Sequence, residues 1–556
     1  MKHKIIKSLL FTGLLALAFM VSCSKKIDDA YLNPNAAVVE PIETILSGVI
    51  GGFTAYFSSA GTGYGVQADG ILLGRYIQYW GHNTSGELYG IMGSPMGTAS
   101  DNTGSVWAAV YYGHGQNVNK IIQWGTEQQK WDYVGAAWAI RAWGWLELTN
   151  EYSDAPLREA FNTSLSQFHY ETQPEFYDSC RAVCFRALSF LNRTDGKVNQ
   201  ANLAIGDAYF NNGDVNKWKK FVYGTLARSY IDLSNKTMFT NNHYADSAIK
   251  YANLAMTTNA DNAVVKVAGG NTSQVLNYFG PFRGNLNTTT STIRQGAYIA
   301  DLMSGANPGA FTGVADPRRW YMLRENLNKT FKGVTVWAGL NGLSANDLPQ
   351  HFYGNPNPTL ATVGNPDSTR YLFQNTSPWP LMTASEMQFI IAEAALRKGD
   401  NATALTAYTN AISLNFDMLT TTYNQNIPAA AVITPATKAA YLANPAIVPV
   451  TPAGLTLTHI MLQKYIALYA WGVQQTWTDM RKFHYTDPDP STGGQVYANF
   501  TPPTGNNLIS TNNNKWVYRC RPRYNSEYLY DVPELTRIGA FQNLDYTTNE
   551  MWFSQK

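Results

Sequence analysis

The stretch Trp131-Asp-Tyr-Val134-Gly-Ala-Ala-Trp138-Ala-Ile-Arg-Ala142-Trp-Gly-Trp145 alternates large and small side chains with a helical spacing. Its bulky residues stand at positions 131, 134, 138 and 145, and Gly135, Ala139 and Ala142 lie between them. This spacing follows the 3.6-residue turn of an α-helix, and the small residues allow a second helix to approach closely. The stretch therefore predicts packed antiparallel helices.

Working outward from this stretch, three helix pairs are predicted in the chain. They are 107–124 with 128–150, 218–233 with 248–256, and 385–398 with 404–412. Between the last two, Gly399 suits a helix end and Asp400-Asn401 suits a new N-cap. The segment 458–483 predicts one long closing helix. The pairs resemble tetratricopeptide-type hairpins without a fixed repeat period, so the expected fold is mainly α.

The segment between two of these pairs has a different composition. Residues 259–380 are dense in Gly, Asn, Thr and Pro, as in Asn355-Pro-Asn-Pro358 and Ser377-Pro-Trp-Pro380. Such turn-forming residues predict ordered loops and short strands rather than helices. A long irregular insertion in a compact protein usually serves a function. We expect a body at 42–556, with a helical scaffold at about 42–258 and 381–556 and a loop-rich insertion at 259–380.

The first 41 residues are expected to target and tether the protein. Three lysines within positions 1–7 precede an apolar run that ends at Met20-Val-Ser-Cys23. A basic start and a short apolar run are typical of a secretory signal, here 1–22. A small residue followed by Cys resembles the lipobox of bacterial lipoproteins, which predicts lipid on Cys23. Residues 23–41 are polar and predict a flexible leash, and no later segment predicts a transmembrane helix.

Composition excludes several classes of protein. Of the 556 residues, 14% are charged and 13% aromatic, and 41 basic side chains face 39 acidic ones. Disorder needs more charge and fewer aromatics, and nucleic-acid binding needs a basic excess. The three cysteines left after processing, Cys180, Cys184 and Cys520, predict buried thiols rather than a metal site or a disulfide framework.

Enzyme and metal motifs are also lacking. The sequence has no Gly-x-Ser-x-Gly elbow, His-Glu-x-x-His motif or P-loop. The segment Asp487-Pro-Asp489-Pro-Ser491-Thr-Gly493 begins like a calcium loop but has neither Gly at its sixth place nor Glu at its twelfth. We therefore expect no catalytic activity and no cofactor, and calcium is possible but not predicted.

Motifs spread over most of the chain carry a family resemblance. They are Val106-Trp107 with Tyr111-Tyr112, Thr149-Asn150 with Asp154-Ala-Pro156, Gly206-Asp207, Trp218-Lys-Lys-Phe221, Leu226-Ala-Arg228, Asp316-Pro-Arg318, Ser385-Glu-Met387, Gln463-Lys-Tyr465, Trp477-Thr-Asp479-Met-Arg481 and Arg521-Pro-Arg523-Tyr-Asn525. In this order, behind a lipobox, they resemble SusD/RagB-family outer-membrane lipoproteins of the SusD-like branch. Members of that family often carry Glu where Gln474 or Gln475 stands and Arg where Lys482 stands.

The resemblance implies a role in nutrient uptake. Proteins of this kind are lipid-anchored in the outer membrane, face the cell exterior, and act as a lid on a SusC-like TonB-dependent β-barrel transporter. Their ligands are oligosaccharides in most members and peptides in some. The first hypothesis is therefore glycan capture for such a transporter. Peptide capture and a structural adaptor without ligand remain the alternatives.

Aromatic side chains on loops are the candidates for ligand binding. A sugar ring presents flat C–H faces that pack on an aromatic ring, while amides bind its hydroxyls. Loops on a rigid scaffold are where such residues concentrate. The candidates are Tyr79, Trp80, Asn83 and Tyr89 near the N-terminus and Trp320, Trp337, Tyr353 and Trp379 in the insertion.

Overall fold

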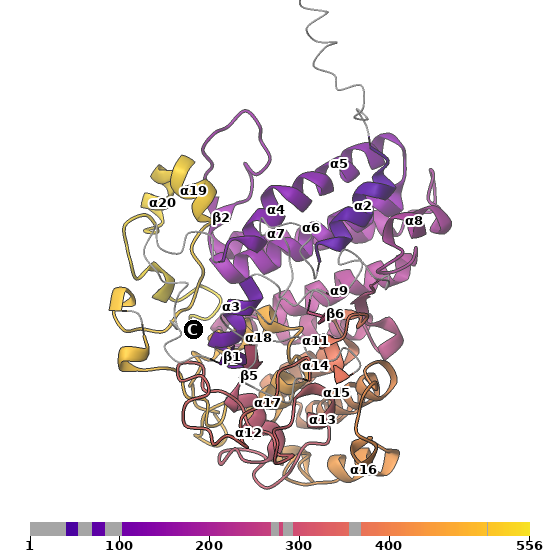
Figure 1. Ribbon diagram of the computed structural model, residues 1–556. Helices are drawn as coiled ribbons and strands as arrows, with labels where there is room; N and C mark the ends of the chain where they lie inside the picture. The colour runs from indigo at the N-terminus through magenta and orange to yellow at the C-terminus, as the bar shows by residue number, and fades with distance from the viewer. Residues whose placement is uncertain are drawn as a thin grey trace, which may run out of the picture.

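The computed structural model shows a mainly helical protein with a few short strands (Figure 1). It describes residues 40–53, 69–83, 103–267, 277, 279–281, 293–354, 368–508 and 510–556. Within these ranges no helix is long and apolar enough to cross a membrane. The predicted signal (1–22) and the lipidation residue Cys23 lie outside the described residues.

The helices of the N-terminal half are α2 (Ile42–Gly51), α3 (Ile71–Tyr76), α4 (Ser105–Tyr111), α5 (Gly113–Glu127), α6 (Trp131–Tyr152), α7 (Gln173–Leu191), α8 (Gln200–Asp207), α9 (Val215–Ile231), α10 (Thr237–Asn241) and α11 (Tyr244–Leu254). The later helices are α12 (Ala297–Ser304), α13 (Arg319–Met322), α14 (Ala384–Arg397), α15 (Asn401–Thr422), α16 (Pro435–Leu442), α17 (Leu457–Ala467), α18 (Val473–Lys482), α19 (Tyr524–Tyr530) and α20 (Val532–Arg537). In Figure 1 helices α2 and α4 to α8 lie in the upper part, and α9 and α11 lie below them, next to α14.

The helices stack as hairpins, as the sequence predicts. Helix α6 packs against α5 and α7, α9 packs against α7 and α11, and α14 packs against α11, α15 and α17. The turn between α14 and α15 has the predicted caps. Gly399 adopts a left-handed φ of 83°, and the Asp400 side chain accepts a hydrogen bond from the Thr403 amide. All three predicted helix pairs are confirmed.

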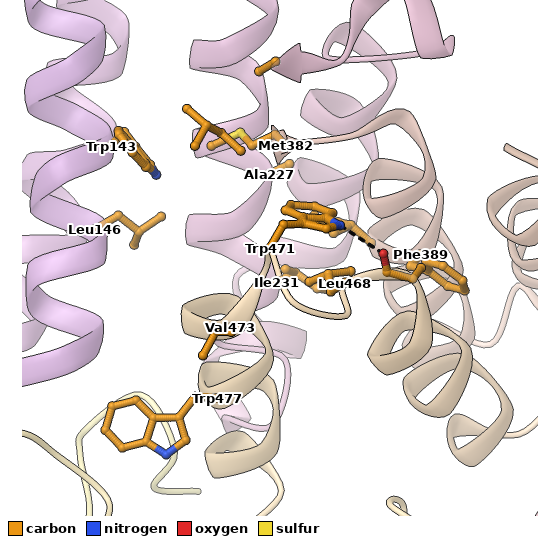
Figure 2. Close-up of a cluster of buried hydrophobic side chains, with 14 of the residues drawn as sticks. Trp143, Leu146, Ala227, Ile231, Met382, Phe389, Leu468, Trp471, Val473 and Trp477 are labelled. Carbon is orange, nitrogen blue, oxygen red and sulfur yellow. Dashed lines mark hydrogen bonds between the residues drawn. The ribbon is translucent and has the colours of Figure 1, made fainter. Parts of the chain in front are cut away.

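The prediction of one closing helix at 458–483 is wrong. The segment forms two helices, α17 and α18, separated by five residues in which Ala470 takes a left-handed φ of 71°. Trp471 fills the break: its indole NH donates to the Ala467 carbonyl at 3.1 Å and its ring is buried. Figure 2 shows Trp471 and Trp477 on this segment and Trp143 of α6 across from it. Burial of the Trp471 ring compensates for the interrupted helix.

Short antiparallel strand pairs connect the insertion to the scaffold. Strand β1 (Trp80–His82) pairs antiparallel with β5 (Ile293–Gln295), and β4 (Ala263–Val265) pairs antiparallel with β6 (Trp379–Met382). The third small sheet, β2 (Ala155–Pro156) with β3 (Tyr170–Glu171), frames the loop between α6 and α7. The expected loops and short strands are present. The insertion also contains α12 and α13, which the turn-rich composition did not indicate.

A polar network lies at the centre of the protein. Lys482 of α18 contacts Glu393 of α14 at 2.7 Å, and Lys464 of α17 contacts Asp479 at 2.7 Å, all four side chains being buried. Buried charges are tolerated when they are paired in this way. Gln474, Gln475 and Lys482, the positions at which the chain departs from the pattern of the family it resembles, are all buried. The three described cysteines are buried and free, as expected.

Candidate functional site

Two of the predicted ligand-binding residues, Asn83 and Trp337, lie on adjoining backbone segments. Asn83 follows β1, and its carbonyl accepts a hydrogen bond from the Leu340 amide at 3.2 Å. Trp337 stands in a tight turn closed by the Gly339 amide, which donates to the Thr335 carbonyl at 2.9 Å. Both side chains are half-buried. We call this pair of segments, 82–83 and 335–340, the Trp337 face.

The β1–β5 ladder fixes the position of the Trp337 face. Gly81 of β1 lies against the next segment, so that a Cβ there would come 3.2 Å from the Cα of Val336. The Gly296 amide donates to the Tyr79 carbonyl and the Val334 amide to the Gln295 carbonyl, both at 2.9 Å. These backbone contacts hold the turn rigidly beside β1. A half-buried indole and an amide residue on such a support are suited to a flat, uncharged ligand.

Two arginines lie near the Trp337 face, Arg75 beside His82 and Arg294 opposite Gly81 in the β1–β5 ladder. The Arg75 guanidinium contacts the His82 ring. Burial, together with the positive charge of Arg75, lowers the pKa of His82 to about 4. His82 is therefore neutral at physiological pH and accepts rather than donates at the nitrogen that faces Arg75.

Tyr79 and Trp80 do not face a ligand. The Tyr79 ring is fully buried against Tyr465, with ring centroids 4.6 Å apart, and its hydroxyl donates to the Tyr465 carbonyl at 2.6 Å. The Trp80 indole is 3% exposed and donates to the Ile71 carbonyl at 2.9 Å. Both rings hold β1 to the helices, so their predicted role in binding is corrected to a structural one.

Tyr353 and Trp379 are also core residues. Tyr353 is fully buried beside His351, at 4.6 Å between ring centroids. Trp379, 3% exposed in β6, stacks on Phe279 with centroids 4.9 Å apart and planes 24° apart. Both rings are buried, because the insertion folds back on its own aromatics. The prediction of ligand stacking by these two is wrong for the same reason as for Tyr79.

Trp320 belongs to a different cluster from Trp337. It is half-buried on α13 and meets Phe331 edge-on, with centroids 4.8 Å apart. Arg319 lies 5.9 Å from its ring centroid. Among the described aromatic contacts none joins Trp320 to Trp337, so the predicted loop aromatics do not form one continuous platform. Tyr89 lies outside the described residues.

A surface pocket that the sequence analysis did not identify lies at the junction of α4 and α5. It has a volume of about 150 Å³, and we call it the ring pocket. It is lined by Trp107, Tyr111, Tyr112, Gln116, Pro156, Ala160, Phe161, Asn162, Thr163, Leu165, Phe168 and Glu527. The signal that could have revealed it is the loop Phe161-Asn-Thr-Ser-Leu165-Ser-Gln-Phe168, where apolar side chains stand among small polar ones between two prolines.

The segment that begins like a calcium loop has a structural role at Asp489. Asp489 is buried, and its Oδ2 accepts hydrogen bonds from the Thr458 amide at 2.6 Å and the Thr458 hydroxyl at 2.8 Å. It thereby caps the first turn of α17 from outside the helix. In the part of the chain that the structure describes, no group of three or more His, Cys, Asp or Glu side chains is placed to hold a metal ion.

Comparison with known proteins identifies the family of this chain. A family model described as "Starch-binding associating with outer membrane" matches residues 66–503, which is most of the chain. The chain belongs to the SusD-like family. The resemblance seen in the sequence motifs is thereby confirmed, and so is the helical, tetratricopeptide-like fold. No curated protein matches the chain.

Solved structures of SusD-like proteins share this fold at low sequence identity. A SusD/RagB family protein from Bacteroides thetaiotaomicron has 20% identity and a TM-score of 0.62, over 93% of this chain and 99% of that one. A SusD homolog from Bacteroides fragilis has 18% identity and a TM-score of 0.64, over 92% and 100%. A chitin-binding protein has 18% identity and a TM-score of 0.60, over 92% and 99%.

Proposed function

We propose that this SusD-like protein captures neutral oligosaccharides at the cell surface and passes them to a SusC-like TonB-dependent transporter, on which it acts as a lid. The observation that carries the proposal is the Trp337 face. A half-buried indole stands there beside a backbone-anchored amide residue, Asn83, on a scaffold of a family described as starch-binding.

The chemistry of the Trp337 face supports an uncharged ligand. His82 is neutral because its pKa is lowered to about 4, so it adds no charge to those of Arg75 and of the fully buried Arg294 of β5. A sugar ring needs an apolar face and hydrogen bonds to its hydroxyls rather than an ion pair. An indole with a neighbouring amide supplies both.

Attachment to the outer membrane is proposed to run through lipid on Cys23. The family model describes association with the outer membrane, and the lipobox-like Met20-Val-Ser-Cys23 supplies the residue for it. Changing Cys23→Ser should move the protein from the membrane fraction to the soluble fraction. Retention of Cys23→Ser in the membrane fraction would contradict lipid anchoring at this residue.

The ligand class is tested by calorimetric titration of the purified full chain in detergent. The panel comprises maltohexaose, chitohexaose, xylohexaose and a tryptic digest of casein. We expect binding of at least one hexasaccharide, no release of reducing sugar, and a loss of affinity of at least tenfold in Trp337→Ala. The matched control is Trp138→Ala, which removes a half-buried indole of α6 that packs under Arg186, 4.8 Å from its centroid.

Each other outcome points to an alternative. Saturation by the casein peptides alone favours peptide capture by the same architecture. Co-purification with a SusC-like transporter without any soluble ligand favours a structural adaptor. Equal losses in Trp337→Ala and Trp138→Ala would place the ligand elsewhere than on the Trp337 face.

A further inference from the structure

The ring pocket has the construction of a binding site. Five aromatic rings line it: Trp107 of α4, Tyr111 and Tyr112 at the α4–α5 junction, and Phe161 and Phe168 on the loop between β2 and β3. Tyr112 is 44% exposed, an unusual degree for a large ring on a protein that buries most of its aromatics. Exposed rings gathered around a concavity mark interaction sites rather than ordinary surface.

The aromatic walls are fixed in place by interactions behind the pocket. The Arg141 guanidinium lies 4.4 Å from the centroid of the Phe161 ring. Arg141 itself donates to the Gly115 carbonyl at 3.2 Å and to Asn119 Oδ1 at 2.8 Å. The Tyr111 hydroxyl donates to the Pro156 carbonyl at 2.6 Å. Rings held in this way lose little freedom when a ligand arrives, which favours binding.

The loop that carries Phe161 and Phe168 is held near both ends by hydrogen bonds from its backbone to carboxylates. Glu171 accepts from the Leu157 amide at 2.7 Å, and Asp531 accepts from the Phe168 amide at 2.9 Å. Between these anchors Phe161 takes a left-handed φ of 70°. A non-glycine residue adopts that conformation only where its surroundings impose it, and such strain concentrates at functional sites.

The floor of the ring pocket is polar but already satisfied. Glu527 accepts from the Trp107 indole at 3.2 Å on one oxygen and from the Tyr170 hydroxyl on the other. Burial raises the pKa of its carboxyl. Glu527 therefore positions Trp107 and Tyr170, and both of its oxygens are engaged.

The rim carries neutral hydrogen-bonding groups. Gln116, Asn162 and Thr163 are exposed at the mouth. Asn162 Oδ1 accepts from the Ser164 amide at 3.1 Å and the Ser164 hydroxyl at 2.7 Å, which orients the Asn162 side chain. An amide side chain also carries an NH₂ group that can donate to a hydroxyl.

Size and chemistry together define the ligand. A cavity of about 150 Å³ holds one six-membered ring, since an engineered cavity of that size binds benzene. Aromatic walls suit the C–H faces of a sugar, and neutral amides at the rim suit its hydroxyls. We propose that the ring pocket is a second binding site, separate from the Trp337 face, that takes one neutral hexopyranose unit of an oligosaccharide. This inference rests on the proposed function for the nature of its cargo.

The test uses single sugars on the full chain in detergent, with the Trp337 face disabled by Trp337→Ala. The probes are methyl α-glucopyranoside, methyl β-galactopyranoside, methyl α-mannopyranoside and N-acetylglucosamine, observed by saturation-transfer NMR. We expect at least one probe to receive saturation at its ring protons. Adding Tyr112→Ala or Phe161→Gly should reduce that signal at least threefold. Glycine retains the left-handed backbone at position 161, so Phe161→Gly removes the ring without new strain.

The matched control is Tyr209→Ala, which removes a ring of similar exposure, 49%, on another surface after α8. It should leave the signal unchanged. Signals that survive both Tyr112→Ala and Phe161→Gly, or no signal from any of the four sugars, would overturn the second site. Either result leaves the proposed function standing if hexasaccharide binding in the otherwise unaltered chain depends on Trp337. A signal from Gly-Gly-Phe-Gly-Gly that depends on Tyr112, with none from the sugars, would assign the pocket to peptides and also overturn the inference.

Discussion

Gln475 donates its side-chain amide to Oδ1 of Asp232 over 2.8 Å in the buried centre of the protein. The other oxygen of Asp232 accepts from the side-chain Nδ2 of Asn150 at 3.0 Å. Burial raises the pKa of this carboxyl, and nearby Asp479 acts in the same direction. Position 475 thus supplies a neutral donor to a buried carboxylate, alongside the Asn150 side chain and the charge of Lys482.

Changing Gln475→Glu should destabilise the protein. The new carboxyl would lie against Asp232, which would raise the folded-state pKa of the new carboxyl. The loss in the free energy of unfolding is therefore small below about pH 4.3 and grows as the pH rises through that raised pKa. We expect a loss of about 2–4 kcal/mol at pH 8, measured by urea unfolding at pH 5 and pH 8. Gln475→Met is the uncharged control of similar length and should show a weaker dependence on pH. Equal stability of Gln475→Glu at both pH values would contradict this account.

The hairpin scaffold was predictable from the sequence because it depends on local patterns. Large and small residues at helical spacing identified α6, and Gly399 with Asp400 identified the turn between α14 and α15. The break between α17 and α18 was not predictable. It depends on a left-handed alanine, Ala470, whose conformation is imposed by the burial of Trp471 rather than by its own propensity.

The binding residues were less predictable because burial is decided by distant partners. In the sequence, Tyr79 stands where a helix runs into a loop. In the structure its ring is covered by Tyr465, nearly four hundred residues away. Trp337 and Tyr353 come from the same turn-rich segment, yet Trp337 is half-buried whereas Tyr353 is fully buried. Among the candidates that the structure describes, Asn83 and the turn of Trp337 are brought together from distant parts of the chain.

Glu147 should make stability depend on pH near neutrality. Burial raises the pKa of its carboxyl to about 7, against the opposing effect of Arg228. Because the folded-state pKa lies above the unfolded value, the contribution of protonated Glu147 to the free energy of unfolding is complete below about pH 4.5. This contribution is lost as the pH rises through 7. Glu147→Gln removes this loss and still accepts from the Trp143 indole, which lies 2.8 Å away.

Urea unfolding of the two proteins between pH 5 and pH 8 checks this prediction. The stability of Glu147→Gln relative to the unaltered protein should rise across that range by up to about 3 kcal/mol, the equivalent of a shift of about two units. A constant difference across the range would show that Glu147 stays ionised in the folded state.

His484 should stabilise the C-terminal segment when it is protonated. Its Nδ1 lies 2.7 Å from Asp487 and its Nε2 lies 2.6 Å from Glu550. Burial alone would lower the pKa of His484, but the two carboxylates outweigh it and the pKa is raised. The stabilisation is therefore full below the ordinary pKa of about 6.5 and is lost as the pH rises through the raised value.

His484→Gln should lower the thermal midpoint at pH 5.5 by an amount that corresponds to about 1 kcal/mol, because the pair is partly exposed. The difference should shrink at pH 9. The double variant with Glu550→Gln is the control, and its loss should be smaller than the sum of the two single losses. Additive losses would show that the two side chains do not interact.

Arg318 should be irreplaceable by lysine. Its guanidinium donates to Asp316 through Nε and Nη2, at 3.0 and 2.6 Å, and through its other donors to Asn415 at 2.8 Å and Gln463 at 2.5 Å, all fully or almost fully buried. An ammonium group cannot reach these acceptors together, so Arg318→Lys leaves buried oxygens without donors. We expect a loss of about 3 kcal/mol in the free energy of unfolding.

Arg319→Lys is the control from the same motif, since Arg319 is half-buried and contacts only the Asp316 carbonyl among the described hydrogen bonds, at 2.7 Å. Similar small effects of the two changes would mean that Asp316 rather than the planar guanidinium organises the cluster.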